Sequence, residues 1–230
     1  MVRPVRGKKM FKVVAMIPIK LDSKRFPNKN LKEFDDGIPL INLIQKTALK
    51  IKEIEKTYVF CSDDKIQKYL LKGIDFLPRS KTLDSDSTNA TELLDEFVSK
   101  VDSEIYVMLH ATSPFVTSGT IIRGIKGVSS NEYDSAYPVQ KLQKFVWFNG
   151  SPLNFSLNPV PRTQDVEPVY CEIANPFIFR KEVFTEYRQR TGKKPLPLEQ
   201  SWIESVDIDE PEDFEVAQLV YTFLNKDKKL

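Results

Sequence analysis

Strand-forming and helix-forming segments alternate along this chain, and this alternation constrains its fold more than any other feature. Runs rich in β-branched and aromatic residues predict strands, and segments with apolar residues every three or four positions predict helices between them. Strands that are joined through helices favour a mainly parallel sheet with helices on both of its faces. We therefore predict an α/β fold with three layers, α/β/α, around a mainly parallel sheet.

The individual elements follow from the same patterns. The first strand is the clearest, because an apolar run ends abruptly in a polar loop. Predicted strands span residues 12–19, 57–61, 74–77, 104–110, 135–139, 177–179 and 204–208. Predicted helices span residues 40–54, 64–72, 92–100, 117–128, 182–190 and 211–224.

The pattern becomes irregular after the fifth predicted strand. Asn149-Gly150 predicts a hairpin turn between short strands at 144–148 and 153–157. Several prolines follow, and a loop is predicted at residues 192–197. We expect an excursion from the sheet at about residues 140–175.

The bulk composition limits the classes of function. At 230 residues, with 41% hydrophobic and 29% charged residues, the chain can bury a core, and we expect a single domain at 11–224 with tails at 1–10 and 225–230. The net charge of +2 is close to balance and argues against general nucleic-acid binding. No apolar run approaches the roughly 20 residues that span a bilayer, and no signal-peptide core follows the basic N-terminus. We therefore expect a cytoplasmic protein without nucleic-acid or membrane partners.

Cysteine and histidine are scarce in this chain. Cys61 and Cys171 are far apart and have no neighbours at metal-ligand spacing, so we expect free thiols. His110 is the only histidine, which excludes a site built from several imidazoles. A catalytic triad would have to use that one residue.

The loop after the first strand carries four cations, at Lys20, Lys24, Arg25 and Lys29. In open α/β sheets, ligands bind beyond the carboxyl ends of the strands. Cations spaced along a loop at such a place can bind several phosphate oxygens, with Ser23 and backbone amides as further donors, and they indicate a polyanion such as a triphosphate. The loop has neither a P-loop nor a Rossmann fingerprint. The alternative is an ordinary solvated basic loop.

An acidic motif near the C-terminus complements this loop. Asp207 and Asp209 lie in the predicted strand at 204–208 and directly after it, and residues two apart on a strand project from the same face. Such a pair can hold Mg²⁺, which is commonly bound by one or two carboxylates together with substrate phosphates. The alternative is an acidic strand end that leads into a helix, with Glu212 and Asp213 favoured by the helix dipole.

Two further strand ends carry polar residues. His110 is followed by Thr112 and Ser113, and these side chains can hydrogen-bond a base or a ribose. Arg79 follows the third predicted strand, and a polar stretch that contains Ser87 comes after it. The alternatives are a structural histidine and an ordinary loop with a helix cap.

Taken together, four segments resemble one family. They are IPIKLDSKRFPNKN, FCSDD, HATSPF and ESVDIDEPEDFEVAQ, and their order and approximate spacing match over residues 11 to 224. The chain resembles the cytidylyltransferases that activate sialic acids and related keto-acid sugars, the CMP-sialic acid (acylneuraminate) and CMP-Kdo synthetases. The resemblance implies a nucleotidyltransferase-type, Rossmann-like fold.

The resemblance also implies an activity. An oxygen of an acidic sugar of the nonulosonic type attacks the α-phosphorus of CTP with the help of Mg²⁺, which gives a CMP conjugate for surface glycans and pyrophosphate. In the family, the excursion crosses into a partner subunit, which implies a homodimer. Phosphoryl chemistry of this kind depends on positioning and charge neutralisation and needs no protein nucleophile.

Motif positions assign roles to single residues by the same resemblance. The implied catalytic residues are Lys20, Lys29 and Asp209. The implied nucleotide-binding residues are Ile19, Lys20, Leu21, Ser23, Lys24, Lys29, Asn30, Arg79, Ser87 and His110, and position 110 is usually glutamine in the family. The implied metal ligands are Asp207 and Asp209, and the implied acceptor-binding residues are Gln140, Arg162, Glu172 and Asn175.

The chain departs from the family pattern at three places. Lys20-Leu21 replaces an arginine-glycine pair, and Val116 replaces a common arginine. Residues 170–176 replace an arginine-x-asparagine-glycine motif that helps to hold the acceptor's carboxylate. Glu172 would repel a carboxylate there unless Arg162 or a lysine compensates. An acceptor such as a phosphonate or an amino-bearing acid therefore remains an alternative, as does a catalytically silent nucleotide-binding protein.

Overall fold

The computed structural model of the protein describes residues 12–226. The predicted tail at 1–10 lies outside the described residues, as do residues 227–230 of the predicted C-terminal tail. Residues 225 and 226 continue the last helix rather than a tail.

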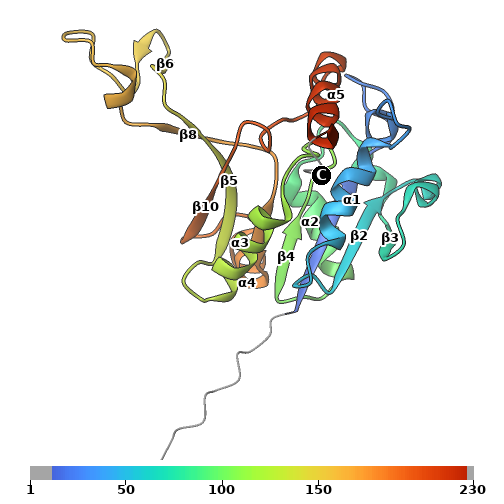
Figure 1. Ribbon diagram of the computed structural model, residues 1–230. Coiled ribbons are helices and arrows are strands. Elements are labelled where there is room, and N and C mark those ends of the chain that lie inside the picture. The colour runs from blue at the N-terminus through green and yellow to red at the C-terminus, as the bar shows by residue number, and fades with distance from the viewer. Residues whose placement is uncertain (1–11, 227–230) are drawn as a thin grey trace, which may run out of the picture.

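The centre of the fold is one twisted sheet (Figure 1). Its strand order is β3-β2-β1-β4-β9-β5-β10, and β8 also pairs with β5. The pairs β3–β2, β2–β1, β1–β4 and β5–β10 are parallel, whereas β9 is antiparallel to both of its neighbours and β8 is antiparallel to β5. The strands are β1 (Val13–Ile19), β2 (Lys56–Cys61), β3 (Ile74–Pro78), β4 (Ile105–Met108), β5 (Ser135–Leu142), β8 (Val169–Glu172), β9 (Phe177–Arg180) and β10 (Pro195–Gln200).

Helices cover both faces of the sheet, which confirms the predicted three layers. Helices α1 and α3 contribute to the hydrophobic cluster on one face, and α2 and α4 to the cluster on the other. Helix α5 packs beside α1 (Figure 1). The α-helices are α1 (Leu40–Leu49), α2 (Ala90–Lys100), α3 (Ser118–Ser129), α4 (Lys181–Tyr187) and α5 (Pro211–Lys226), and the 3₁₀ helices are η1 (Lys29–Leu31), η2 (Asp64–Tyr69), η3 (Lys81–Asp84) and η4 (Thr163–Asp165).

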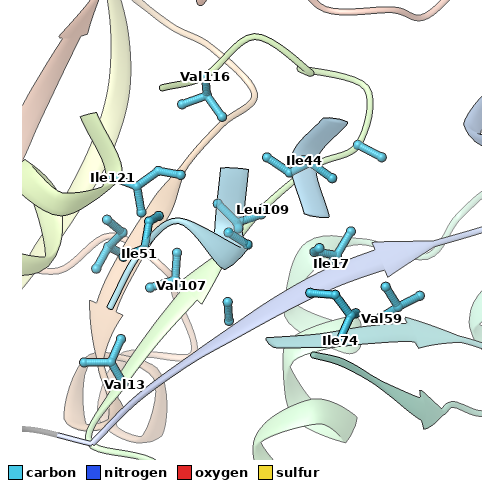
Figure 2. Packing of buried hydrophobic residues seen from close by; sticks show 14 of the residues in the cluster. Val13, Ile17, Ile44, Ile51, Val59, Ile74, Val107, Leu109, Val116 and Ile121 are labelled. Atoms are coloured by element: carbon cyan, nitrogen blue, oxygen red, sulfur yellow. The ribbon is translucent and has the colours of Figure 1, made fainter. Parts of the chain in front are cut away.

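Strand β1 lies between two hydrophobic clusters. Val13 and Ile17 belong to the cluster that also contains Ile44 of α1 (Figure 2). Val14 belongs to the cluster that contains Phe97 of α2. Both faces of this strand are therefore buried, which explains why its sequence is a continuous apolar run instead of an alternation of apolar and polar residues.

Two predictions near the C-terminus are wrong. The predicted loop at 192–197 contains the start of β10, which pairs in parallel with β5. Its prolines are tolerated because β10 lies at the edge of the sheet, where a missing N–H leaves no ladder bond unmade. The predicted strand at 204–208 is absent, and turns and extended chain occupy these residues. Asp207 and Asp209 therefore do not share the face of a strand.

Three helices are shorter than their predictions at 40–54, 64–72 and 182–190. The first ends at Leu49, the second is the 3₁₀ helix η2, and the third ends at Tyr187 because Arg188 adopts a left-handed φ of 57°. The predicted strands before residue 140 are all present, with ends within about three residues of the prediction.

The excursion leaves the sheet between β5 and β8 and extends away from it (Figure 1). It contains a small hairpin of β6 (Trp147–Phe148) and β7 (Ser151–Pro152). The predicted strand at 144–148 is shortened to its last two residues, and the predicted strand at 153–157 is wrong, because the second strand begins directly after the turn and ends at Pro152. The predicted turn at Asn149-Gly150 is confirmed, with φ of 48° and 78°. Trp147 is 55% exposed and Phe148 64%.

The helices of residues 12–226 include none that is both long and apolar enough to cross a membrane.

Candidate functional site

The first half of the basic loop contacts the segment before α2. Lys20 and Lys24 both bind the carboxylate of Asp86, Lys20 at 2.6 Å between Nζ and Oδ1. Hydrogen bonds from Lys20 and then Lys24 lower the pKa of Asp86 to about 2. Ser23, Lys20 and Lys24 line a cleft of 580 Å³ together with Asp86. One carboxylate thus neutralises part of the charge of two predicted phosphate-binding lysines.

The second half of the loop contacts the segment before α5, about 180 residues further along the chain. The Nζ atom of Lys29 lies 3.0 Å from Oδ1 of Asp209 and donates to the carbonyl of Ile208 at 2.9 Å. Arg25 binds the same Oδ1 at 2.8 Å and Glu210 at 3.5 Å. Burial alone would raise the pKa of Asp209, but Lys29 and Arg25 outweigh it and lower this pKa. The two predicted motifs at opposite ends of the sequence therefore meet.

Arg79 lies under the loop with much of its hydrogen-bonding capacity free. One guanidinium nitrogen donates to the carbonyl of Ile19 at 3.0 Å and to Asp84 at 2.7 Å. The side chain is 2% exposed, and its Nε and Nη1 atoms have no hydrogen-bond partner among the described residues. Buried donors without a partner are costly, and these two atoms remain available to a hydrogen-bond acceptor. Asn30 braces the same place by donating to the carbonyl of Lys20 at 3.0 Å.

The remaining predicted nucleotide-binding residues border these clefts. Leu21 lines a cleft of 280 Å³ together with Ser62 and Pro78, at the carboxyl ends of β2 and β3. The hydroxyl of Ser87 lies 2.7 Å from the hydroxyl of Ser85, and these serines flank Asp86.

His110 lies two residues beyond β4 and is half-buried. Burial lowers the pKa of His110 to about 4; Arg190 and Lys29 act in the same direction, and Asp207 opposes them. At neutral pH the imidazole is therefore uncharged and can both donate and accept a hydrogen bond. The charges of Lys29 and Arg190 act on His110, so the imidazole lies near both the basic loop and the chain after α4.

Asp207 lies in the chain between β10 and α5, and its charge acts on the pKa of His110. Its Oδ1 atom accepts a hydrogen bond from the hydroxyl of Ser113 at 2.9 Å. Asp207, Gln140 and Trp202 line a cleft of 270 Å³. The amide of Gln140 donates to the hydroxyl of Ser205 at 2.8 Å within the same cleft.

Two buried amides lie near this cleft. Asn175 donates to the carbonyls of His110 at 3.4 Å and Ser113 at 3.3 Å. Gln200 donates to the backbone carbonyl of Asn175 at 2.6 Å. Among residues 12–226, neither side-chain oxygen has a hydrogen-bond partner. Gln200 was not singled out from the sequence, because the first half of its strand, β10, was predicted as a loop and no element was predicted for the second half.

The predicted acceptor residues Arg162 and Glu172 are not brought together. Arg162 lies on the excursion and binds both oxygens of Asp165, at 2.7 and 3.0 Å. Glu172, at the end of β8, contacts Arg190 instead, at 3.4 Å. Arg190 was not singled out from the sequence, because it belongs to no recognisable motif. It supplies the compensating charge that Glu172 requires.

Asp207 and Asp209 fit a magnesium ion only in part. Their oxygens are the hard donors that Mg²⁺ prefers, and the contacts described above use one oxygen of each carboxylate. The described residues contain no group of three or more histidines, cysteines or carboxylates that could hold a metal. A two-carboxylate site suits Mg²⁺ when substrate phosphates and water complete the coordination.

Sequence comparison identifies relatives of this chain. Residues 14–228 match the cytidylyltransferase family. The chain is 25% identical over 232 residues to the N-acylneuraminate cytidylyltransferase of Streptococcus agalactiae serotype V, covering 95% of this chain and 56% of that protein. It is 23% identical over 206 residues to the 3-deoxy-manno-octulosonate cytidylyltransferase of Escherichia coli, covering 83% of this chain and 81% of that protein. The chain spans about half the length of the first curated relatives that it matches.

Solved structures share the fold. The structure of CMP:2-keto-3-deoxy-manno-octonic acid synthetase complexed with CTP superposes with a TM-score of 0.69 at 18% identity, over 92% of this chain and 98% of that one. The 4-diphosphocytidyl-2C-methyl-D-erythritol synthase of Anaerococcus prevotii gives a TM-score of 0.65 at 14% identity, over 92% and 96%. The predicted nucleotidyltransferase-type fold is confirmed. Because the family match extends over most of its length, the chain belongs to the cytidylyltransferase family.

Proposed function

We propose that this protein transfers CMP from CTP to an acidic sugar and releases pyrophosphate. One observation carries the proposal. Four cations of the loop after β1 converge on Asp86 and Asp209, two carboxylates from distant parts of the chain. Such a cluster beyond the carboxyl ends of parallel strands suits a triphosphate.

The proposed reaction needs no protein nucleophile. A hydroxyl oxygen of the acceptor forms a bond to the α-phosphorus, the bond from that phosphorus to the pyrophosphate oxygen breaks, and the hydroxyl proton leaves to solvent. Lys20, Lys24 and Lys29 bind phosphate oxygens and neutralise the charge that develops on pyrophosphate. Asp207 and Asp209 would hold Mg²⁺, which supplies further neutralisation of phosphate charge when it is bound.

The carboxylates give the loop a defined resting arrangement. Asp86 and Asp209 hold the lysines in place before substrate arrives, so that less side-chain entropy is lost on binding. The phosphates of CTP, with several negative charges, compete with these carboxylates for the same ammonium groups. Binding CTP thus exchanges one set of ion pairs for another.

Arg79 and His110 are the proposed contacts to the nucleoside. The free Nε and Nη1 atoms of Arg79 suit a carbonyl oxygen of cytosine or a ribose oxygen. The neutral imidazole of His110 suits either a donor or an acceptor on the same ligand. Ser87 lies beside the phosphate cleft next to Asp86.

The acceptor site is proposed to lie between Gln140, Glu172, Asn175 and His110. The unpartnered oxygens of Asn175 and Gln200 suit the hydroxyl donors of a sugar. Relatives named for N-acylneuraminate and 3-deoxy-manno-octulosonate favour a keto-acid sugar for surface glycans. Glu172 favours the second candidate, an amino-bearing acid whose ammonium would pair with it.

We further propose a cytoplasmic homodimer. The exposed Trp147 and Phe148 of the excursion are apolar surface that a second subunit could cover. Light scattering of the wild-type protein should give twice the mass of the chain. The double variant Trp147→Ser, Phe148→Ser should give the monomer mass, and a wild-type monomer at micromolar concentration would contradict this.

Pyrophosphate release tests the proposed function. The protein is incubated with Mg²⁺, CTP and, in turn, N-acetylneuraminic acid, 3-deoxy-manno-octulosonic acid, an amino-bearing acid sugar and a phosphonate. Release with CTP that greatly exceeds release with UTP or ATP is expected for one acceptor. CTP binding without release for any acceptor would support the silent nucleotide-binding protein instead.

Asp209→Asn tests the metal proposal. Loss of one ligand should lower turnover by about two orders of magnitude or more and weaken the effect of Mg²⁺ on CTP affinity measured by calorimetry. Asp75→Asn, which alters an exposed aspartate paired with Lys56 away from the site, is the control. Near-normal turnover and an unchanged Mg²⁺ effect would reject Asp209 as a ligand.

A further inference from the structure

Arg190 is an arginine whose charge is weakly paired. It follows α4, and its one hydrogen bond to the described residues is the 3.4 Å contact with Glu172. The other six arginines of residues 12–226 each have a contact of 3.2 Å or shorter. Arg190 and Glu172 are 28% and 52% exposed, and such partly solvated pairs are weak.

An aromatic ring fixes the plane of the Arg190 side chain. The guanidinium carbon lies 3.4 Å from the centroid of the ring of Phe177, which is 1% exposed. A guanidinium that stacks on a ring keeps its N–H groups in its own plane, away from the ring. Glu172 accepts a hydrogen bond from one nitrogen of the guanidinium, Nη2. The rest of the fork retains the geometry for a bidentate anion.

Arg190 lies beside the candidate site and not on the outer surface of α4. Phe177 is the first residue of β9 and pairs in register with Met108, the last residue of β4. His110 is two residues further along the chain from Met108, and the charge of Arg190 acts on it. Arg190 therefore lies over the carboxyl end of β4, next to the residues proposed to hold the nucleoside.

The preceding arginine provides a contrast. Arg188 is also at the end of α4, but it forms a short ion pair with Asp95 of α2. It also lies over Phe184, within the packing of α4 on α2. Arg188 therefore stabilises the packing of α4 on α2, whereas Arg190, two residues away, lies beside the site and has only the weak contact with Glu172.

We propose that Arg190 binds the carboxylate of the acidic acceptor. This inference rests on the proposed function and adds a specificity residue that lies outside the sequence motifs. Glu172 holds the guanidinium at one nitrogen and repels a second anion on its own side, so the acceptor's carboxylate docks on the remaining edge of the fork. The pair thus resolves how a site that contains Glu172 can accept an anion.

The experiment compares Arg190→Gln with Arg188→Gln as the matched control. Pyrophosphate release is measured at saturating CTP with whichever of N-acetylneuraminic acid and 3-deoxy-manno-octulosonic acid the wild type uses better. The methyl ester of the same sugar is measured beside it, because it keeps the ring and hydroxyls but lacks the charge. The KM for CTP and the melting temperature report on folding and on the nucleotide site.

Arg190→Gln should raise the KM for the free acid about 10- to 100-fold, as expected for the loss of a charge-assisted bond. Its KM for the methyl ester and for CTP should change less than about threefold, so the preference for acid over ester disappears. Arg188→Gln should keep the wild-type preference. Arg190→Lys should recover part of it, since the charge returns without the planar fork.

Two results would overturn the inference in different ways. If the wild type is active and Arg190→Gln keeps both its KM for the acid and its preference over the ester, Arg190 does not bind the carboxylate and the proposed function stands. If the wild type releases no pyrophosphate with any acid sugar, the proposed function fails and the inference with it. Should Arg190→Gln not fold, Glu172→Gln replaces it: the KM for the acid should fall several-fold, and a rise would reject the inference.

Discussion

The single histidine offers a sharp test of the electrostatics of the site. Burial, with Arg190 and Lys29, lowers the pKa of His110 to about 4 from its ordinary value of 6.5. Between these two values the unfolded chain binds a proton that the folded chain does not. Stability must therefore rise with pH across this window and be lost as the pH falls from 6.5 towards 4.

The magnitude follows from the two pKa values. A shift of one pKa unit corresponds to about 1.4 kcal/mol, and at pH 5 most of the unfolded chains carry the proton. The His110 contribution to the free energy of unfolding should then be about 2 kcal/mol smaller at pH 5 than at pH 7. This figure is a ceiling, because the imidazole is only half-buried and water can solvate part of its charge.

The perturbation is His110→Gln, which keeps a polar side chain that does not titrate. Urea unfolding of wild type and variant is measured at pH 7 and pH 5, with fluorescence and circular dichroism as independent probes. The carboxylates that titrate near pH 5 are common to both proteins, so their contribution cancels in the comparison. The wild type should lose about 1 to 2 kcal/mol more than the variant between the two pH values. Equal losses in both proteins would refute the argument that the imidazole is held neutral.

Three further predictions concern packing and ion pairs. Oε1 of Glu204 accepts a hydrogen bond of 2.7 Å from the hydroxyl of Thr120 at the start of α3. The change Glu204→Gln should therefore lower the free energy of unfolding by about 1 to 3 kcal/mol, which urea unfolding midpoints measure. Gly124→Ala should cost about 1 to 3 kcal/mol, because its Cβ would lie 2.5 and 2.9 Å from side chains of β9 and β10, whereas Gly119→Ala, with its nearest contact at 3.7 Å, should be tolerated. Asp86→Asn should tighten CTP binding about 2- to 30-fold by calorimetry, since the carboxylate no longer competes for two lysines; weaker binding would mean that Asp86 orients them instead.

The sequence predicts the nucleotide side of this fold better than the acceptor side. Strands β1 and β4 are continuous apolar runs with buried faces, and β2 is apolar after its first two residues, so their composition marks them, whereas β3 is only partly buried. That the basic loop and the acidic motif complement each other is anticipated from their residue types, but the ion pair between Lys29 and Asp209 is not predicted. The apolar runs and the two motifs can be predicted because each depends on residues that are close together in the sequence.

The acceptor side depends on contacts that no local pattern encodes. Strand β10 begins with Pro195 and Pro197, residues that favour a loop until the edge position of the strand is known. The strand predicted at 204–208 fails because its alternation of apolar and acidic residues serves two different neighbours, Ser113 and the basic loop. Arg190 becomes visible only when β9 places Phe177 beneath it.

The antiparallel β9 divides the sheet at a seam. On one side lie β1 to β4 and the basic loop, and on the other lie β5, β8 and β10 with the excursion. The seam is crossed by the ladder between Met108 and Phe177 and by the hydrogen bond from Asn175 to the carbonyl of His110. Helix α5 then returns the chain to the first side, where Phe214 stacks on Phe34. Buried residues from both sides of this seam nevertheless share one hydrophobic cluster, in which Ala136 of β5 and Leu198 of β10 belong with Ile17 of β1. Because such a core is closely packed, a change in β5 or β10 is expected to disturb the strand that positions the basic loop as well.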